Sequence, residues 1–217
     1  MVKAVLFDMD GVIIDSEPIH YRLSKLYYSE LGLDITDEEY YTFIGLGDIE
    51  IFKKLKEKYG LKESVDELVD TYQQRYISHL RSLKDEKPIP GVDVLIRDLH
   101  QKGFRLALGS SATKVNIEAV LEYFSLREYF DAVVSGCEVE HSKPFPDIYV
   151  EAAKKLDMDP SECIVIEDSS NGIKAAKLAG MKCIAYRNLN SGEQDLSLAD
   201  HIIDSFEGLD FEGLATR

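Results

Sequence analysis

Two aspartates follow the first apolar run of the chain at a spacing that suggests chemistry. The stretch VLFDMDG (5–11) places Asp8 and Asp10 one residue apart. Side chains two apart in an extended segment point the same way, so we expect both carboxylates to face one crevice. Carboxylates about 5 Å apart repel by roughly 3 kcal/mol at an effective dielectric constant of 20. The pair therefore needs either a shared proton or a bound cation.

Later apolar runs are followed by polar residues in the same manner. These segments are Gly109-Ser110-Ser111, Ser142-Lys143-Pro144 and Glu167-Asp168-Ser169. Each alone would be ordinary loop sequence, because Gly, Ser and Asp are common after strands. In an open parallel sheet, however, the carboxyl ends of the strands share one edge, where ligands bind. We therefore expect all four acidic or polar segments to converge on one site.

The residue types at this edge favour phosphoryl transfer. Oxygen ligands without nearby His or Cys favour Mg²⁺, which also takes a phosphate oxygen of the substrate. Asp8 comes first off the strand and is the candidate nucleophile, while Asp10 can act as general acid and base. Lys143 and the Ser110 loop can offset charge on the transferring group. A carboxylate pair also serves glycoside hydrolysis, but that mechanism leaves Lys143 and the Ser110 loop without a role.

The elements that must position these residues alternate along most of the chain. Short apolar runs predict buried parallel strands at 3–7, 104–109, 131–134, 163–167 and 182–186, with a weaker one at 201–204. Helical periodicity lies near 92–102, 114–124, 146–156 and 171–179. This alternation predicts an α/β fold, with a parallel sheet covered by helices on both faces.

The alternation is interrupted once, between the first and second predicted strands. Residues 16–86 contain only helical periodicity, which predicts an all-helical insertion. The segment KDEKPIPG (84–91) then returns the chain through two prolines, which suit a stiff linker. We therefore expect a core domain made of residues 1–15 and 87–217, and a helical cap domain made of residues 16–86.

Composition and charge exclude several classes of partner. The chain has 217 residues, of which 45% are hydrophobic, so it can bury a sizeable core. Its formal charge of −15 argues against nucleic acid and anionic membrane as partners. No run approaches the roughly 18 apolar residues of a membrane span, and no leader precedes the first strand. We expect a soluble, cytoplasmic protein, monomeric by default.

The cysteines do not indicate a metal site or a disulfide framework. Cys137, Cys163 and Cys183 are scattered, odd in number and lack the C-x-x-C spacing of zinc sites. Cys163 and Cys183 lie in apolar runs, where small buried side chains are expected.

Taken together, four motifs resemble the haloacid dehalogenase superfamily of phosphatases and phosphotransferases. They are DMDGV, GSSA, SKPFPD and IEDSSNG, and they extend over essentially the whole chain. The helical insertion resembles the helical-cap group typified by β-phosphoglucomutase and small sugar-phosphate phosphatases. The resemblance implies a Rossmann-like sheet of strand order 5-4-1-2-3 with an inserted α-helical cap, which would close over the site to exclude water and select the substrate.

The same resemblance implies a role for each motif residue. Asp8 would be the nucleophile and Asp10 the acid/base residue. Mg²⁺ would be held by Asp8, Asp168 and the backbone carbonyl of Asp10, with Glu167 supporting the metal site.

The resemblance also implies the groups that bind the substrate. Ser110 and Lys143 would bind phosphate, with Ser111 beside them. His20 matches a histidine that β-phosphoglucomutases place near the hinge of the cap.

The match to a mutase is incomplete in the cap. Mutases carry an arginine just after the cap glycine, whereas this chain has Gly45-Leu46-Gly47-Asp48. They carry a lysine on a later helix, whereas this chain has Tyr72-Gln73-Gln74-Arg75, and the direction of Arg75 is open. We therefore expect a Mg²⁺-dependent phosphatase of a small phosphorylated metabolite, a sugar phosphate, acting through an aspartyl-phosphate on Asp8. The alternative is a β-phosphoglucomutase that interconverts β-glucose 1-phosphate and glucose 6-phosphate.

Two other classes of protein fit the sequence less well. A receiver domain of a signalling pair also combines acids, a Ser or Thr and a lysine, but it lacks a large helical insertion. Its paired acids end the first strand, whereas its phospho-accepting aspartate comes from a later one. A dinucleotide-binding enzyme would need a third glycine after GLGDIE (45–50) and a preceding strand, and this chain has neither.

Overall fold

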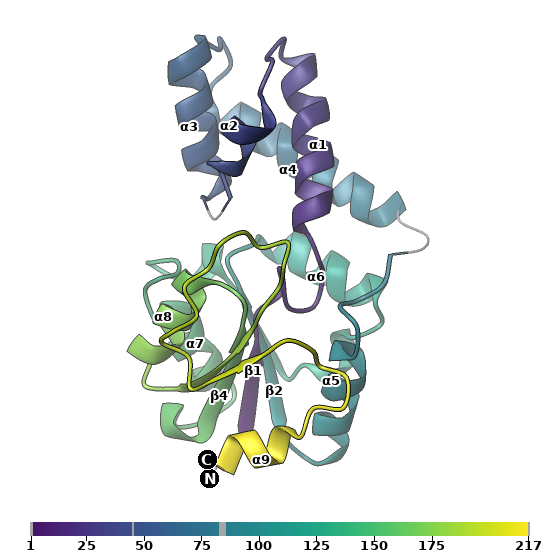
Figure 1. Ribbon diagram of the computed structural model, residues 1–217, viewed down its shortest axis with the longest axis vertical. Coiled ribbons are helices and arrows are strands. Elements are labelled where there is room, and N and C mark those ends of the chain that lie inside the picture. Colours follow the sequence, from purple (N-terminus) through teal and green to yellow (C-terminus); the bar gives the residue numbers. More distant parts are fainter. Residues whose placement is uncertain (1, 45, 83–85, 217) are drawn as a thin grey trace. The chain divides into compact units, whose positions relative to one another are not determined.

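Six parallel strands form the central sheet of the computed structural model, which describes residues 2–44, 46–82 and 86–216 (Figure 1). Their order across the sheet is β3-β2-β1-β4-β5-β6. The strands are β1 (Ala4–Phe7), β2 (Arg105–Ser110), β3 (Ala132–Ser135), β4 (Cys163–Glu167), β5 (Lys182–Tyr186) and β6 (His201–Ile203). This confirms the predicted Rossmann-like order 5-4-1-2-3, with β6 added beside β5 where the weaker apolar run lies.

The register of the central strands explains why their ends meet. Phe7 of β1 pairs with Leu108 of β2 on one side and with Ile166 of β4 on the other. All residues of β1 and β4 are buried, because both strands are continuous apolar runs covered on both faces of the sheet. Consequently β1, β2 and β4 end within two residues of this register, and Asp8, Ser110 and Asp168 lie at the same edge of the sheet.

The predicted core helices are confirmed to within a few residues. They are α5 (Val92–Gln101), α6 (Lys114–Tyr123), α7 (Asp147–Lys155) and α8 (Ser170–Leu178), followed by the short α9 (Phe211–Thr216). Small side chains of α7 and α8 pack on one face of the sheet, together with Cys163 and Cys183. Those two cysteines are buried as expected, and Cys137 is exposed. None of the described helices is both long and apolar enough to cross a membrane.

The described chain divides into two compact units, Met1–Asp15 with Asp85–Arg217, and Ser16–Lys84. The second unit is entirely helical in its described part, with α1 (Glu17–Glu30), α2 (Asp37–Tyr41), α3 (Asp48–Tyr59) and α4 (Val65–Ser82). Its core is aromatic and centres on Phe52, against which Tyr27, Tyr28 and Tyr72 pack edge to face. Most tyrosines of this unit are therefore core residues, whereas Tyr41 is exposed.

Two segments of the sheet-containing unit mark where the helical unit is inserted. Ile13, which follows β1, accepts a hydrogen bond through its carbonyl from the N–H of Ile89 at 2.9 Å. The chain thus leaves the sheet unit and returns to it at neighbouring points. Residues 83–85, at the start of the predicted linker, lie outside the described residues.

Candidate active site

The chain turns sharply after β1, and the turn separates the two aspartates. Asp8 continues the sheet, donating its N–H to the carbonyl of Ile166 at 3.0 Å, whereas Asp10 lies in the turn. Gly11 adopts φ +78°, and a Cβ atom at this position would lie 1.9 Å from Asp168 Oδ2. Only glycine therefore fits between the β1 turn and the acid that follows β4.

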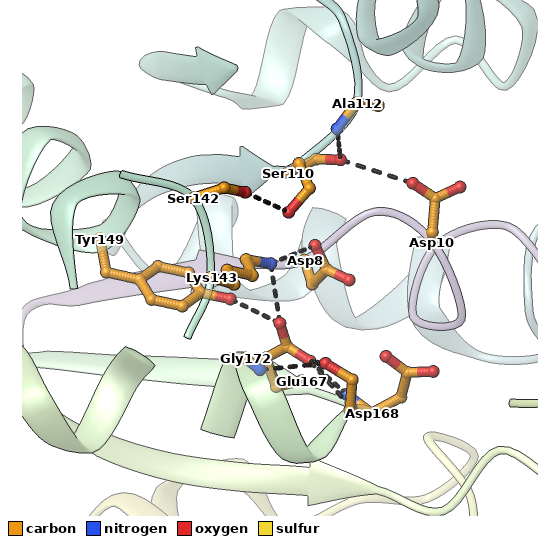
Figure 2. A network of polar contacts seen from close by, with 12 residues as sticks. Asp8, Asp10, Ser110, Ala112, Ser142, Lys143, Tyr149, Glu167, Asp168 and Gly172 are labelled. Carbon is orange, nitrogen blue, oxygen red and sulfur yellow. Dashed lines mark hydrogen bonds and ion pairs between the residues drawn. The ribbon is translucent and has the colours of Figure 1, made fainter. Parts of the chain in front are cut away.

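A buried lysine joins the acids that follow two different strands. Lys143 Nζ donates to Asp8 Oδ1 at 2.6 Å and to Glu167 Oε1 at 2.7 Å (Figure 2). The lysine side chain is only 7% exposed and its ammonium lies 5.0 Å from the centroid of the Tyr149 ring. Residues 135 positions apart in the chain are thus brought into direct contact, as the strand-end argument anticipates.

The carboxylate of Glu167 is fully engaged by protein donors. Its Oε1 accepts from Lys143 and from the hydroxyl of Tyr149 at 2.9 Å. Its Oε2 accepts from the backbone N–H groups of Asp168 and Ser169 at 2.8 and 2.9 Å, and from the Ser169 hydroxyl at 3.0 Å. Glu167 therefore fixes Lys143 and the start of the β4 loop in place.

Burial sets the protonation of this cluster. Desolvation, helped by the charges of Glu167 and Asp10, raises the pKa of Asp8 to about 8, although Lys143 acts in the opposite direction. Burial and the charges of Glu167 and Asp8 raise the pKa of Asp168 well above its usual value.

The other two members of the cluster stay charged. Burial opposes the ionisation of Glu167, but Lys143 and the hydrogen-bond donors around it lower its pKa. The attraction of the carboxylates outweighs burial and raises the pKa of Lys143. When Asp8, Glu167 and Asp168 are all ionised, the positive charge of Lys143 does not balance their three negative charges. A bound cation would supply the missing positive charge.

The donor set of the cluster fits a divalent cation. One oxygen from each of Asp8, Glu167 and Asp168 lies within 4.8 Å of the others. Lys143 occupies Asp8 Oδ1, and Ser191 Oγ donates to Asp168 Oδ2, which leaves the second oxygen of each aspartate for a cation. Hard oxygen donors with an excess of negative charge are what Mg²⁺ requires.

Asp10 lies apart from this cluster and faces the residue that ends β2 (Figure 2). Ser110 Oγ donates to Asp10 Oδ2 at 3.4 Å and accepts from the N–H of Ala112 at 3.0 Å. β1 ends at Phe7, so Asp10 lies in the turn and not in the extended strand that the alternation rule assumes. A metal role for Asp10 therefore remains a prediction that concerns its backbone carbonyl.

The two remaining predicted residues of the sheet edge differ in burial. Ser110 is fully buried, whereas Ser111 is exposed. Ser111 Oγ lies 3.2 Å from Ser142 Oγ, so the β2 loop meets the segment that carries Lys143. All three later polar segments thus lie around the end of β1.

Tyr149 and Ser191 also contact the acids of the site, although no motif in the sequence indicates either residue. Tyr149 is fully buried on α7, and an aromatic residue on an amphipathic helix is normally a core residue. Ser191 lies in the loop after β5, and this strand ends at the same edge as β4. Applying the strand-end rule to β5 would have indicated this loop.

His20 belongs to a polar cluster within the helical unit. Its Nδ1 lies 2.8 Å from the Tyr72 hydroxyl, and its ring stacks on Tyr76 with centroids 4.5 Å apart. A cavity of about 110 Å³ adjoins it, lined by Glu17, His20, Ser24, Tyr28, Tyr40, Phe43, Ile44, Leu46, Asp48, Ile51, Phe52 and Tyr72. Gly45, the predicted cap glycine, lies outside the described residues.

Arg75 is engaged elsewhere in the helical unit. Its guanidinium donates to both carboxylate oxygens of Glu30, at 2.8 and 2.5 Å, and lies 4.7 Å from the centroid of the Tyr27 ring. The direction that the sequence left open is therefore toward α1, and Arg75 does not line the cavity.

Comparison with known proteins places the chain in a family. The model of the haloacid dehalogenase-like hydrolases matches residues 5–186. Hexitol phosphatase B of Escherichia coli (strain K12) is 33% identical over 199 residues, which cover 84% of this chain and 82% of that protein. The chain spans 18% and 53% of the length of two longer Arabidopsis thaliana relatives, to which it is 35% and 33% identical.

Solved structures share the fold over nearly the whole chain. A mutant of CbbY from Rhodobacter sphaeroides in complex with xylulose-(1,5)bisphosphate has a TM-score of 0.87 at 28% identity, covering 99% of both chains. A β-phosphoglucomutase from Clostridium difficile has a TM-score of 0.84 at 27% identity, covering 100% of this chain and 96% of the other. The chain therefore belongs to the haloacid dehalogenase-like hydrolases.

Proposed function

We propose that the chain is a Mg²⁺-dependent phosphatase that hydrolyses a small sugar phosphate through an aspartyl-phosphate on Asp8. The observation that carries this proposal is the placement of Asp8. It is buried at the end of β1, with Lys143 on one carboxylate oxygen and Asp168 beside it. Membership of a phosphatase group and the similarity to a hexitol phosphatase support the reaction type and the class of substrate.

The first half-reaction forms the phospho-enzyme. Asp8 Oδ1, the oxygen beside Lys143, attacks phosphorus and leaves Oδ2 for the metal. A new bond forms between Oδ1 and phosphorus while the bond from phosphorus to the sugar oxygen breaks. Asp10 donates a proton to the leaving sugar oxygen. Ser110 orients Asp10 through the hydrogen bond at 3.4 Å, and Lys143 offsets the charge that gathers on the phosphoryl oxygens.

The second half-reaction returns the enzyme to its starting state. Asp10, now ionised, takes a proton from a water molecule whose oxygen attacks phosphorus. The bond between Asp8 and phosphorus breaks, and inorganic phosphate is released. Asp10 thus ends the cycle protonated, ready to act again as an acid.

The metal site in this proposal consists of the second oxygens of Asp8 and Asp168, with the backbone carbonyl of Asp10. Bound Mg²⁺ supplies positive charge that keeps the acids ionised and offsets the charge of the phosphoryl group. Glu167 does not need to be a direct ligand, because five protein donors already occupy its oxygens. Its task is to hold Lys143.

The second candidate is a β-phosphoglucomutase, which the similarity to the Clostridium difficile structure favours. Such an enzyme must hold a bisphosphate, so it needs a cation for the second phosphate group. The cavity in the helical unit carries the acids Glu17 and Asp48, and no Lys or Arg among its described lining residues. Arg75 is paired with Glu30. This charge pattern favours a monophosphate, and hence hydrolysis.

We also propose that His20 contributes to binding of the sugar. The cavity beside His20 is lined by hydroxyl, imidazole and carboxylate groups together with aromatic rings. Such a lining suits an uncharged ligand with several hydroxyl groups. Replacement by Ala should raise KM for the sugar phosphate more than it lowers kcat. An unchanged KM would remove this role.

The nucleophile is tested by Asp8→Asn. The variant should release no phosphate from any substrate and should carry no phosphoryl mass after mixing with substrate and rapid quenching. Its circular dichroism and its melting temperature should remain those of a folded protein. Phosphate release at the wild-type rate would refute the assignment.

Hydrolysis and mutase activity are separated by a panel of sugar and polyol monophosphates. Phosphate release and isomerisation of β-glucose 1-phosphate to glucose 6-phosphate are assayed in parallel, with and without glucose 1,6-bisphosphate. We expect phosphate release from at least one monophosphate and no isomerisation. Rapid isomerisation that depends on the bisphosphate would make the mutase the correct assignment.

A further inference from the structure

The loop that follows β5 reaches the candidate active site, although no motif indicates it. Residues 188–194, which we call the β5 loop, contribute several side chains that contact the β1 turn and the residues after β4. Asn188 Nδ2 donates to the carbonyl of Gly11 at 3.1 Å, and Asn190 Nδ2 donates to Asp15 Oδ2 at 2.6 Å. Ser191 Oγ donates to Asp168 Oδ2. One loop thus joins the two segments that carry the nucleophile and the proposed metal ligand.

A glutamine holds Ser191 in position. Gln194 Oε1 accepts from the N–H of Ser170 at 2.9 Å, while its Nε2 donates to the carbonyl of Ser191 at 2.8 Å. Asp195 N–H adds a further bond to Ser170 Oγ at 2.6 Å. Because Ser170 opens α8, the backbone of Ser191 is tied to the helix that begins two residues after Asp168.

The space around the Asp168 carboxylate is closely filled on this side. A Cβ atom on Gly11 would lie 1.9 Å from Asp168 Oδ2 and 3.0 Å from Ser191 Oγ, so these three groups meet at one point. Asp168 itself is 5% exposed. A carboxylate held by one oxygen in such a place presents its other oxygen in a defined direction, which is what a metal ligand needs.

We propose that Ser191 is a positioning residue that orients Asp168 for Mg²⁺, acting through its hydroxyl and held in place by Gln194. This inference rests on the proposed function, because it presumes that Asp168 is a metal ligand. Loss of such outer hydrogen bonds typically weakens metal binding by roughly 10- to 100-fold. Metal binding becomes weaker because the carboxylate of Asp168 is then free to rotate, and this freedom is lost when the ion binds.

The test is isothermal titration calorimetry of the full-length protein with MgCl₂ alone. Ser191→Ala should raise the dissociation constant for Mg²⁺ by about tenfold or more. Ser191→Thr keeps a hydroxyl and should stay close to wild type, within about twofold. Ser197→Ala makes the same chemical change at an exposed position a few residues along and should have no effect.

A second variant tests whether Ser191→Ala weakens Mg²⁺ binding only by loosening the loop. Gln194→Ala leaves the Ser191 hydroxyl in place but removes its support, so it should weaken Mg²⁺ binding by less than Ser191→Ala does. In an Asp168→Asn background, Ser191→Ala should cause little further loss, because the two residues act as one unit. Equal and additive losses in both backgrounds would mean that Ser191 acts through general loosening, and would overturn the inference.

The outcomes separate this inference from the proposed function. If wild type binds Mg²⁺ and Ser191→Ala binds it with the same dissociation constant, the positioning role is wrong and the phosphatase proposal is unaffected. If wild-type protein binds no Mg²⁺, the metal site of the proposed function is wrong and the inference fails with it. Weaker binding by Ser191→Ala, restored by Ser191→Thr, supports both.

Discussion

The sheet edge and the interior of the helical unit both bury polar groups, but the groups differ in kind. At the sheet edge, Asp8, Lys143 and Glu167 are charged or chargeable and lie within direct contact of one another. Among the described residues of the helical unit, the buried polar groups are neutral, such as the hydroxyl of Tyr72, which bonds to Ser24 at 3.2 Å. Buried charges cost more free energy than buried neutral groups that are hydrogen-bonded, so the sheet edge depends more strongly on each of its partners.

The difference leads to a graded set of expectations. Removing a charge at the sheet edge should affect both activity and stability strongly. Removing a hydroxyl in the helical unit should have only a small effect on stability.

Lys143→Met should lower activity and stability together. Phosphate release, measured as kcat/KM, should fall by roughly 10³-fold, because a cation beside the transferring group is lost. In metal-free buffer the free energy of unfolding should also fall by about 3 kcal/mol, because buried acids lose their partner. Lys154→Met is a matched control on α7, since that side chain is 74% exposed. If Lys154→Met lowered activity and stability as much as Lys143→Met does, the special importance of the buried charges at the sheet edge would be contradicted.

Asp10→Asn should slow catalysis without affecting stability as strongly. We expect a loss of about 10²- to 10⁴-fold for a sugar phosphate, because the leaving oxygen then lacks a proton donor. For p-nitrophenyl phosphate, formation of the phospho-enzyme should be slowed much less, since nitrophenolate leaves without a proton. Stopped-flow release of nitrophenolate measures this step. An equal loss with both substrates would remove the role of Asp10 as general acid.

The stability of the metal-free protein should depend on pH in a specific direction. The folded-state pKa of Asp8 is about 8 and that of Asp168 is also raised, so the folded protein binds more protons than the unfolded chain at intermediate pH. The melting temperature in EDTA should therefore fall as pH rises from about 4 to 8. Added Mg²⁺ should raise it more at pH 8 than at pH 5. Scanning calorimetry at pH 5 and pH 8 tests this. A melting temperature in EDTA that does not change with pH would contradict the raised pKa values of Asp8 and Asp168.

Tyr72→Phe should have the smallest effect. It removes the hydroxyl that is bonded to His20 and Ser24 but keeps the ring packed against Phe52. The free energy of unfolding, measured in urea, should fall by about 1 kcal/mol. Tyr41→Phe is the matched control on an exposed ring and should change nothing measurable. A loss as large as that of Lys143→Met would show that the two regions do not differ.

The sequence predicts the sheet well because its strands are local patterns. Each central strand is a continuous apolar run, and the residue that ends it is recognisable by type, as with Asp8 and Glu167. The order of the strands and the convergence of their ends then follow from general rules for parallel sheets. The positions of Lys143 and Asp168 at the same edge are consequences of this topology.

What the sequence does not predict depends on contacts between distant residues. Nothing local distinguishes Tyr149 from a core aromatic residue, or Ser191 from any other loop serine. Whether Arg75 would face a cavity or a neighbouring helix depended on Glu30, 45 positions earlier. The sequence also did not show that β1 ends at Phe7, so that Asp10 lies in the turn beyond the strand.

The hydrogen bond between Ile13 and Ile89 has an evolutionary consequence. Because the inserted segment starts and finishes at adjoining backbone positions, its length can vary at little entropic cost to the sheet. Mutation, shortening or replacement of the stretch between these positions leaves the four motifs untouched. A lineage could therefore remodel one contiguous block of its gene while the residues at the ends of β1 and β4 are inherited unchanged.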